Sequence, residues 1–379
     1  MPSRAHQLLE LGQSVWLDYI HRAQLASGEF TSLVRDSGVV GVTSNPTIFQ
    51  QAIAEGKVYQ GAIDAGVARH LEGEALFESL ALDDIRTACD LLAPVFARTG
   101  GRDGRVSLEV APRAAFDTHT TIADGRRLHR EAGRPNVMIK VPATEAGLPA
   151  IAELTAEGVC VNITLIFSLD RYAQVIDAWL AGLERRVASR LDISEIFSVA
   201  SFFVSRVDTK VDGAIEQRLK ALPDGPERRE LEGLRGQAAV ANARLAYQKF
   251  RDAFGSARFA ALRERGAHVQ RPLWASTSTK NPAYPDTLYV DELIGSDTVN
   301  TMPPKTLQAF NDHGTLAVTI DRDLDQARRL FQRLPELGIP VNELIAQLEG
   351  EGVKTFAKSF DSLLETLEQS RQAAAGRMR

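Results

Sequence analysis

The chain contains eight short apolar segments, separated by longer stretches in which apolar residues recur at helical spacing. Most of the apolar segments are rich in β-branched residues and show no strict alternation of polar and apolar positions. This pattern is typical of strands that are buried on both faces, as in parallel sheets. It predicts strands at residues 14–20, 39–43, 106–110, 137–141, 159–166, 197–204, 272–276 and 298–302.

Helical patterns fill the intervals between the predicted strands. Residues 74–97 carry apolar side chains at helical spacing. Ser168 is a suitable N-cap for a helix over residues 169–187. The apolar positions from Val353 to Leu367 predict a C-terminal helix at about residues 352–370.

This alternation predicts an α/β fold in which parallel strands are joined by right-handed crossovers. Eight strands fit a closed (β/α)₈ barrel, or TIM barrel, better than an open sheet. Such a barrel takes roughly 250 residues and can exceed 400 with insertions, so residues 1–379 are predicted to form a single barrel domain. The long intervals at about 46–105 and 207–271 are interpreted as helical insertions.

Composition narrows the class of partner. A net charge of −5 and a pI near 5.9 give no basic patch for nucleic acid or for an anionic membrane, so neither partner is expected. Cys89 and Cys160 lie in apolar surroundings and are expected to be buried thiols rather than a disulfide framework. The first residues lack a signal pattern and no apolar run approaches a membrane span, which together indicate a cytoplasmic protein.

Three ionisable residues lie at the C-terminal parts of predicted buried strands, namely Asp18, Glu109 and Lys140. In a parallel barrel these strand ends form one face, which is where active sites of such barrels lie. An unpaired buried charge is costly, so charged residues inside buried strands are paired or functional. We therefore expect the three side chains to face one cavity.

Lys140 suits covalent chemistry at a ketone. Its apolar strand would desolvate the side chain and favour the neutral amine, which can attack a ketone and form an imine. Glu109 is then the natural general acid/base, Asp18 could accept a hydroxyl proton, and Thr164 could position a water. The plainer alternatives are a snorkelling lysine, ion-paired or helix-capping carboxylates, and an ordinary strand threonine.

Arg206 and Lys280 follow neighbouring strands and could bind a phosphate, with Ser276 donating a hydrogen bond. Solvated surface cations are the alternative for both. The sequence contains no glycine-rich nucleotide motif and no histidine pattern with metal-ligand spacing, so no cofactor and no metal are expected.

Four motifs in order resemble those of the transaldolase family, over about residues 16–305. Residues 43–47 read TSNPT, 137–147 read VMIKVPATEAG, 161–168 read VNITLIFS and 201–206 read SFFVSR. The segment 274–281, WASTSTKN, and the chain length are similar to the longer bacterial subgroup.

This resemblance implies a (β/α)₈ barrel and a metal-independent Schiff-base enzyme of the pentose phosphate pathway. It would transfer dihydroxyacetone from sedoheptulose 7-phosphate or fructose 6-phosphate to glyceraldehyde 3-phosphate or erythrose 4-phosphate. The resemblance implies that Lys140 forms the Schiff base, that Glu109 is the acid/base and that Asp18 is the base for carbon–carbon cleavage. It implies that Thr164 orders a water and that Asn45 and Asn162 bind substrate hydroxyls. Ser201 and Arg206 would lie on the phosphate side.

One departure concerns the phosphate. Shorter members carry an arginine soon after the seventh strand, whereas this chain has two extra residues and Lys280 there. Because lysine is a point charge and not a planar fork, phosphate affinity could differ. The register does not decide between Ser276 and Ser278 as the phosphate-binding hydroxyl.

Two rival functions stay open at the level of sequence. Related fructose 6-phosphate aldolases resemble transaldolase but carry Gln at the position of Glu109 and Tyr at the position of Phe203, which we place beside the substrate. A catalytically silent barrel that binds phosphosugars would keep Arg206 and Lys280 without needing the lysine and both carboxylates. The sequence is compatible with a monomer or a homodimer.

Overall fold

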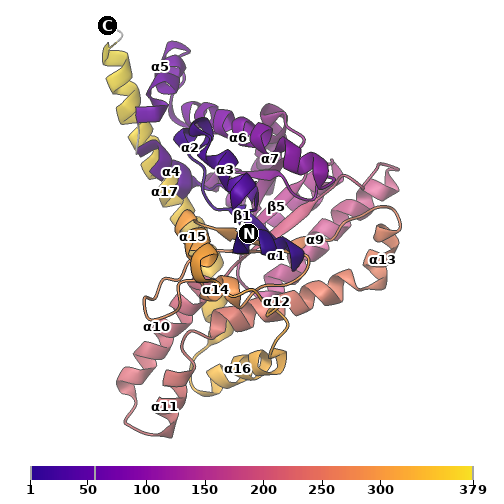
Figure 1. Ribbon diagram of the computed structural model, residues 1–379, viewed down its shortest axis with the longest axis vertical. Coiled ribbons are helices and arrows are strands. Elements are labelled where there is room, and N and C mark those ends of the chain that lie inside the picture. The colour runs from indigo at the N-terminus through magenta and orange to yellow at the C-terminus, as the bar shows by residue number, and fades with distance from the viewer. Residues whose placement is uncertain (1, 55–56, 378–379) are drawn as a thin grey trace.

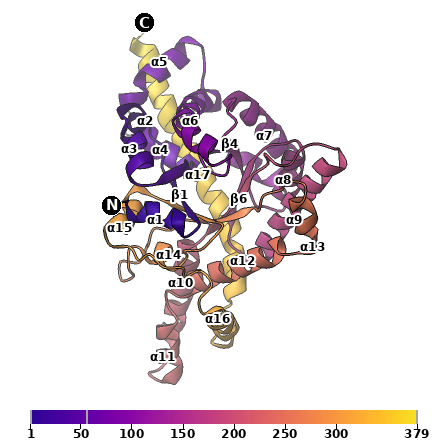
Figure 2. The ribbon, with the colours of Figure 1, turned by 45° about the vertical axis from the view of Figure 1, so that its right-hand side comes forward.

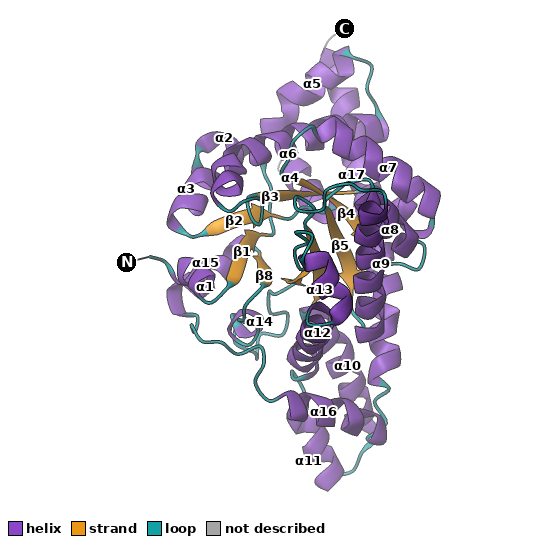
Figure 3. Ribbon diagram, turned by 90° about the vertical axis from the view of Figure 1, so that its right-hand side faces the viewer, coloured by secondary structure: helices purple, strands orange, loops and turns teal. Residues whose placement is uncertain are grey.

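The structure, a computed structural model, describes residues 2–54 and 57–377. Eight parallel strands close into a barrel in chain order, and the helices surround it (Figure 3). All eight predicted strands are present, and their ends lie within a few residues of the predicted positions. Their bounds are β1 (Gln13–Leu17), β2 (Val39–Val42), β3 (Arg105–Glu109), β4 (Val137–Pro142), β5 (Val161–Ile166), β6 (Ser198–Phe203), β7 (Arg271–Ala275) and β8 (Thr298–Met302).

The helices surround the barrel and also make up both long insertions (Figure 1). Helices before β5 are α1 (Arg4–Glu10), α2 (Arg22–Ser27), α3 (Glu29–Asp36), α4 (Pro46–Ala54), α5 (Gln60–Ala68), α6 (Gly73–Arg98), α7 (Thr118–Ala132) and α8 (Gly147–Ala156), with short 3₁₀ helices η1 (Lys57–Tyr59) and η2 (Pro112–Phe116). Those after β5 are α9 (Leu169–Ala188), α10 (Ser205–Ala221), α11 (Pro226–Gly233), α12 (Ala238–Phe254), α13 (Ala257–Arg263), α14 (Leu288–Asp291), α15 (Pro304–His313), α16 (Leu324–Glu336) and α17 (Val341–Arg377).

The two long intervals contain helices, as predicted. The interval between β2 and β3 holds α4, α5 and α6, and that between β6 and β7 holds α10 to α13. Helix α6 coincides with the predicted helix at 74–97. Helix α9 begins after Ser168, whose side chain accepts a hydrogen bond from the Arg171 N–H and thereby caps the helix.

The prediction for the C-terminal helix was too short. Helix α17 begins at Val341 instead of about 352 and continues to Arg377. The apolar face extends in both directions, since Ile345 and Ala374 are buried. Gly352 interrupts the apolar pattern locally, and it allows close packing there, since an added Cβ would lie 2.9 Å from the end of the Leu165 side chain on β5.

Helix α17 crosses the C-terminal face of the barrel, where it packs against α4, α10 and β5 (Figure 2). A hydrogen bond of 2.9 Å between the Thr47 and Ser359 hydroxyls ties it to α4. An ion pair of 2.8 Å between Arg171 and Glu349 ties it to α9. Both thiols, Cys89 and Cys160, are free and buried. Over the residues that the structure describes, no helix combines the length and the apolar character that a membrane crossing requires.

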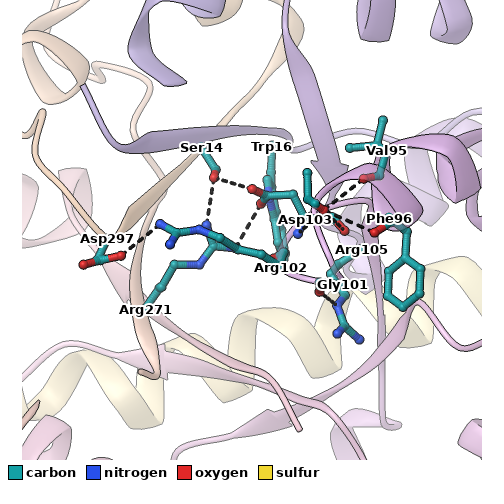
Figure 4. Close-up of polar contacts among 11 residues, drawn as sticks. Ser14, Trp16, Val95, Phe96, Gly101, Arg102, Asp103, Arg105, Arg271 and Asp297 are labelled. Carbon is teal, nitrogen blue, oxygen red and sulfur yellow. Dashed lines mark hydrogen bonds and ion pairs between the residues drawn. The ribbon is translucent and has the colours of Figure 1, made fainter. Parts of the chain in front are cut away.

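The opposite, N-terminal end of the barrel is closed by a buried ion pair between Arg271 and Asp103 (Figure 4). The guanidinium and carboxylate are 2.9 Å apart, and both side chains are less than one-tenth exposed. Asp103 also accepts hydrogen bonds from the Ser14 hydroxyl and the Trp16 indole. Burial alone would raise the Asp103 pKa, but the charge of Arg271 and these hydrogen bonds hold it below its ordinary value.

We predict that Arg271→Met destabilises the protein by about 3–5 kcal/mol, because it leaves the Asp103 carboxylate buried without its partner. Chemical denaturation at neutral pH measures the change. Arg102→Met is the matched control, since Arg102 pairs with Asp297 where both side chains are 44% exposed, and its cost should stay within about 1 kcal/mol. Equal losses in the two variants would contradict this account of the barrel end.

Candidate active site

The centre of the C-terminal face is an ion pair between Lys140 and Glu109. The two residues are register partners on β4 and β3, so both side chains point to the same side of the sheet. Lys140 Nζ lies 3.1 Å from Glu109 Oε2, and each side chain is 5% exposed. The same nitrogen donates a hydrogen bond of 3.0 Å to the Ser44 carbonyl oxygen. The amine is therefore held in one place by a carboxylate and a backbone dipole.

Asp18 lies beside this pair, directly after the end of β1. Its Oδ1 accepts a hydrogen bond of 2.6 Å from the Thr43 hydroxyl. Burial raises the Asp18 pKa above its ordinary value, although the Thr43 hydrogen bond and the charge of Lys140 oppose the rise. Burial raises the Glu109 pKa as well; Lys140 lowers it and the negative charge of Asp18 adds to the rise. The raised pKa makes both carboxyls better able to hold and return a proton than a solvent-exposed carboxylate.

A cavity of about 630 Å³ opens above the ion pair, within the range of small-molecule sites. Nine of the predicted site residues line it, contributed by strands or loops from several parts of the barrel. They are Asp18, Asn45, Lys140, Thr164, Ser201, Phe203, Arg206, Ser276 and Lys280. Volume alone does not identify the site, because a cavity of about 670 Å³ between α9, α12, α16 and α17 is lined by none of the predicted residues.

Glu109 and Asn162 are the two predicted residues that do not line this cavity. Glu109 lies behind Lys140 and borders a space of about 20 Å³ next to α6 and α17. Of the three ionisable groups expected to face the cavity, Asp18 and Lys140 therefore do so, whereas Glu109 contacts it only through Lys140. Asn162 is fully buried; it donates to the Ser107 hydroxyl and accepts from the Ser201 hydroxyl. It connects β3, β5 and β6 beneath the cavity.

Thr164 and Phe203 complete the wall on the β5 and β6 side. The Thr164 hydroxyl is buried and, among the described residues, has no hydrogen-bond partner. Leu165, the next residue, has a left-handed backbone with φ of 61°, which is strained for a residue with a branched side chain. The Phe203 ring lies against the Phe167 ring at 5.1 Å between centroids, which fixes its orientation toward the cavity.

Arg206 and Lys280 also line the cavity, and within the described ranges neither forms an ion pair with a carboxylate. The Arg206 guanidinium carbon lies 5.4 Å from the centre of the Phe203 ring. Burial lowers the pKa of both groups, and the charge of Arg206 lowers that of Lys280 further, while the charge of Asp18 opposes the fall. Two neighbouring cations, neither of them in an ion pair, suit an anion such as a phosphate.

The sequence did not decide whether Ser276 or Ser278 binds the phosphate, and both residues line the cavity. Ser276 Oγ lies 2.9 Å from Ser205 Oγ, while Ser278 Oγ accepts a hydrogen bond of 2.6 Å from Lys280 Nζ. Ser276 has a φ of 56°, so the chain turns sharply there as it leaves β7. Both hydroxyls can therefore reach a ligand held by the cations.

Sequence reasoning missed several contributors to the site. Thr43 and Ser44 lie in the TSNPT segment, where only Asn45 was given a role; the buried polar pair before a conspicuous Asn-Pro was the available signal. Phe356 of α17 lines the cavity from a helix more than 200 residues away from Lys140 in sequence. No local pattern could have revealed it.

Over the described part of the chain, no three His, Cys, Asp or Glu side chains are grouped as metal ligands. A closed parallel barrel with a lysine–carboxylate pair at its C-terminal face places the chain in the class of (β/α)₈-barrel enzymes equipped for imine chemistry.

Comparison with known proteins gives the family. A family model described as transaldolase/fructose-6-phosphate aldolase matches residues 15–367. The chain is 49% identical over 370 residues to a transaldolase of Thermobifida fusca, covering 97% of this chain and 98% of that one. It is 49% identical to a transaldolase of Mycobacterium ulcerans and 46% identical to transaldolase 2 of a Nostoc species, each over 96% of both chains. The chain belongs to the transaldolase/fructose-6-phosphate aldolase family.

We predict that Asp18→Asn stabilises the folded protein at neutral pH by about 1 kcal/mol while it impairs function. The pKa of Asp18 is higher in the folded protein than its ordinary value of 3.8. Ionisation of Asp18 therefore destabilises the folded state as the pH rises above 3.8 and through the folded-state pKa. The advantage of the variant should therefore be absent below about pH 3 and present at pH 7.

Denaturation curves of wild type and variant at both pH values check this. Asp36→Asn is the control, because Asp36 is exposed and its hydrogen bond with Arg35 lowers its pKa, which reverses the sign. An Asp18→Asn advantage that shrinks as the pH rises would rule out the assigned direction.

Proposed function

We propose that this protein is a transaldolase acting through a Schiff base on Lys140. It moves a dihydroxyacetone unit from sedoheptulose 7-phosphate or fructose 6-phosphate to glyceraldehyde 3-phosphate or erythrose 4-phosphate, in the non-oxidative pentose phosphate pathway. The observation that carries the proposal is a buried amine 3.1 Å from one carboxylate, lining a cavity that a second carboxylate, Asp18, and the cations Arg206 and Lys280 also line. The amine can form an imine, the carboxylates can transfer protons, and the cations can bind a phosphate.

The first half of the reaction forms the imine. The Lys140 amine attacks the substrate C2 ketone, and Glu109 transfers the protons that convert the carbinolamine to the imine with loss of water. We assign Thr164 the role of positioning the water through which Glu109 acts, because its buried hydroxyl faces the cavity beside Lys140.

The second half breaks and remakes a carbon–carbon bond. Asp18 accepts the proton of the C4 hydroxyl, the C3–C4 bond breaks, and its electron pair moves into the protonated imine to give an enamine. The aldose phosphate leaves, and an acceptor aldehyde binds. The enamine carbon attacks that aldehyde, Asp18 returns the proton to the new hydroxyl, and hydrolysis of the imine restores Lys140.

The remaining predicted residues are assigned to substrate binding. Arg206 and Lys280 bind the phosphate together with the Ser276 and Ser278 hydroxyls, and Ser201 lies on the same side. Asn45 binds sugar hydroxyls, and Asn162, which was predicted to do so, instead holds Ser201 from beneath the cavity through its hydrogen bond. Asn45 already accepts a hydrogen bond of 3.0 Å from the Ile48 N–H, which leaves its amide group to donate.

We infer a cytoplasmic enzyme with phosphorylated sugars as its partners, without nucleic acid or membrane, acting as a monomer or a homodimer. The two free, buried thiols and the acidic net charge support the compartment and the choice of partners. No cofactor is required, because the protonated imine itself supplies the electron sink.

We predict that Lys140→Arg lowers the rate of carbon transfer from labelled fructose 6-phosphate to erythrose 4-phosphate at least about a thousandfold, because a guanidinium forms no imine. Borohydride added with fructose 6-phosphate should give a stable adduct on Lys140 in the wild type, located by peptide mass spectrometry. Lys249→Arg, a conservative change on α12, should keep the rate and the adduct. A wild type that forms no adduct would favour a silent sugar-binding barrel.

Phe203 distinguishes transfer from simple aldol cleavage. A phenylalanine cannot protonate the enamine, so the intermediate waits for an acceptor aldehyde. We predict that Phe203→Tyr raises the release of free dihydroxyacetone from fructose 6-phosphate about tenfold. Phe203→Leu is the control, because it removes the ring without adding a hydroxyl. Unchanged dihydroxyacetone release in Phe203→Tyr, measured by a coupled assay, would count against this role.

A further inference from the structure

Arg206 and Lys280, two of the cations that line the cavity, lie on separate parts of the chain. Arg206 is the second residue of α10, whereas Lys280 lies in the segment of residues 276–291, here termed the Lys280 segment, which leaves β7 and includes α14. The two like charges are close enough that Arg206 lowers the pKa of Lys280. Arg206 repels Lys280 and Asp18 attracts it, so the separation of the two cations depends on what connects the Lys280 segment to α10.

Tyr289 provides one such connection. Its hydroxyl donates a hydrogen bond of 2.8 Å to Asp208 Oδ2, and the other carboxylate oxygen accepts a hydrogen bond of 2.7 Å from the Ala239 N–H. Tyr289 and Asp208 are each 2% exposed. Asp208 follows Arg206 by two residues in the first turn of α10. The hydrogen bond therefore connects the Lys280 segment to the same helical turn that carries the arginine.

Tyr284 provides a second connection, one helical turn further along α10. Its hydroxyl donates a hydrogen bond of 2.7 Å to Asp212 Oδ2, and Asp212 Oδ1 accepts one of 2.9 Å from the Gly236 N–H. Gly236 has a φ of 71°, and a Cβ there would lie 2.7 Å from the Tyr284 ring. Only glycine thus allows the ring to approach this closely.

We propose that Tyr289 and Tyr284 are positioning residues that hold Lys280 at a fixed separation from Arg206 and thereby set the affinity for the substrate phosphate. The inference rests on the proposed function, in which these cations bind that phosphate. Neither tyrosine lines the cavity, so each acts through the backbone of the Lys280 segment. A preorganised cation pair binds an anion more tightly than a pair that must first be brought together.

The test compares fructose 6-phosphate with fructose, which offers the same three-carbon unit without a phosphate. For Tyr289→Phe, KM for fructose 6-phosphate should rise about tenfold, with kcat within about twofold of wild type. The inhibition constant of inorganic phosphate should rise by a similar factor. The kcat/KM for fructose should not change, because that substrate makes no use of the cation pair.

Tyr284→Phe is the second variant, and it should shift the same two constants in the same direction if Tyr289→Phe does not fold. The control is Tyr247→Phe on α12. Tyr247 is also buried and donates a hydrogen bond of 3.0 Å to the Ser296 carbonyl, at the N-terminal end of β8 and away from the cavity. It should lower stability without moving either phosphate constant.

The outcomes separate the two claims. If the wild type prefers fructose 6-phosphate and is inhibited by phosphate, but both tyrosine variants behave like Tyr247→Phe, the positioning role is wrong while the proposed function survives. If the wild type shows no preference for the phosphorylated substrate and no inhibition, the phosphate assignment fails, and the inference fails with it.

Discussion

The site depends on keeping a lysine amine and a glutamate carboxylate together inside a closed barrel. Neighbouring parallel strands place Lys140 and Glu109 as register partners, so that both side chains are buried side by side, with Lys140 facing the cavity and Glu109 behind it. Burial makes each charge costly by itself, so the two stabilise one another. The same burial raises the pKa of Glu109, which allows one carboxyl group to serve as both acid and base.

Both carboxylates and cations surround the cavity above that pair. Asp18 and Glu109 lie near the amine, where protons must move, while Arg206 and Lys280 form no ion pair and are free to bind a phosphate. Helix α17 crosses this face and contributes Phe356, so the far end of the chain helps to enclose the site. At the other end of the barrel the charges are already paired and buried, as expected for a region that contributes stability.

The strands and the residues at their ends could be predicted from sequence, because burial on both faces leaves a continuous apolar run and because Lys140 stands out within one. The roles of Thr43, Phe356 and Tyr289 could not, since each depends on contact between segments that are distant in sequence. The C-terminal helix was predicted too short because Gly352 breaks the pattern locally, and only the packing against Leu165 explains why a glycine stands there.

The central claim is that the amine of Lys140 bonds to the substrate while the unpaired cations hold its phosphate. A crystal structure of the protein soaked with fructose 6-phosphate and frozen during turnover tests both parts at once. The account predicts electron density continuous from Lys140 Nζ to C2 of the sugar, with the phosphate between Arg206 and Lys280. A sugar bound in the cavity without that bond, at full occupancy, would contradict it.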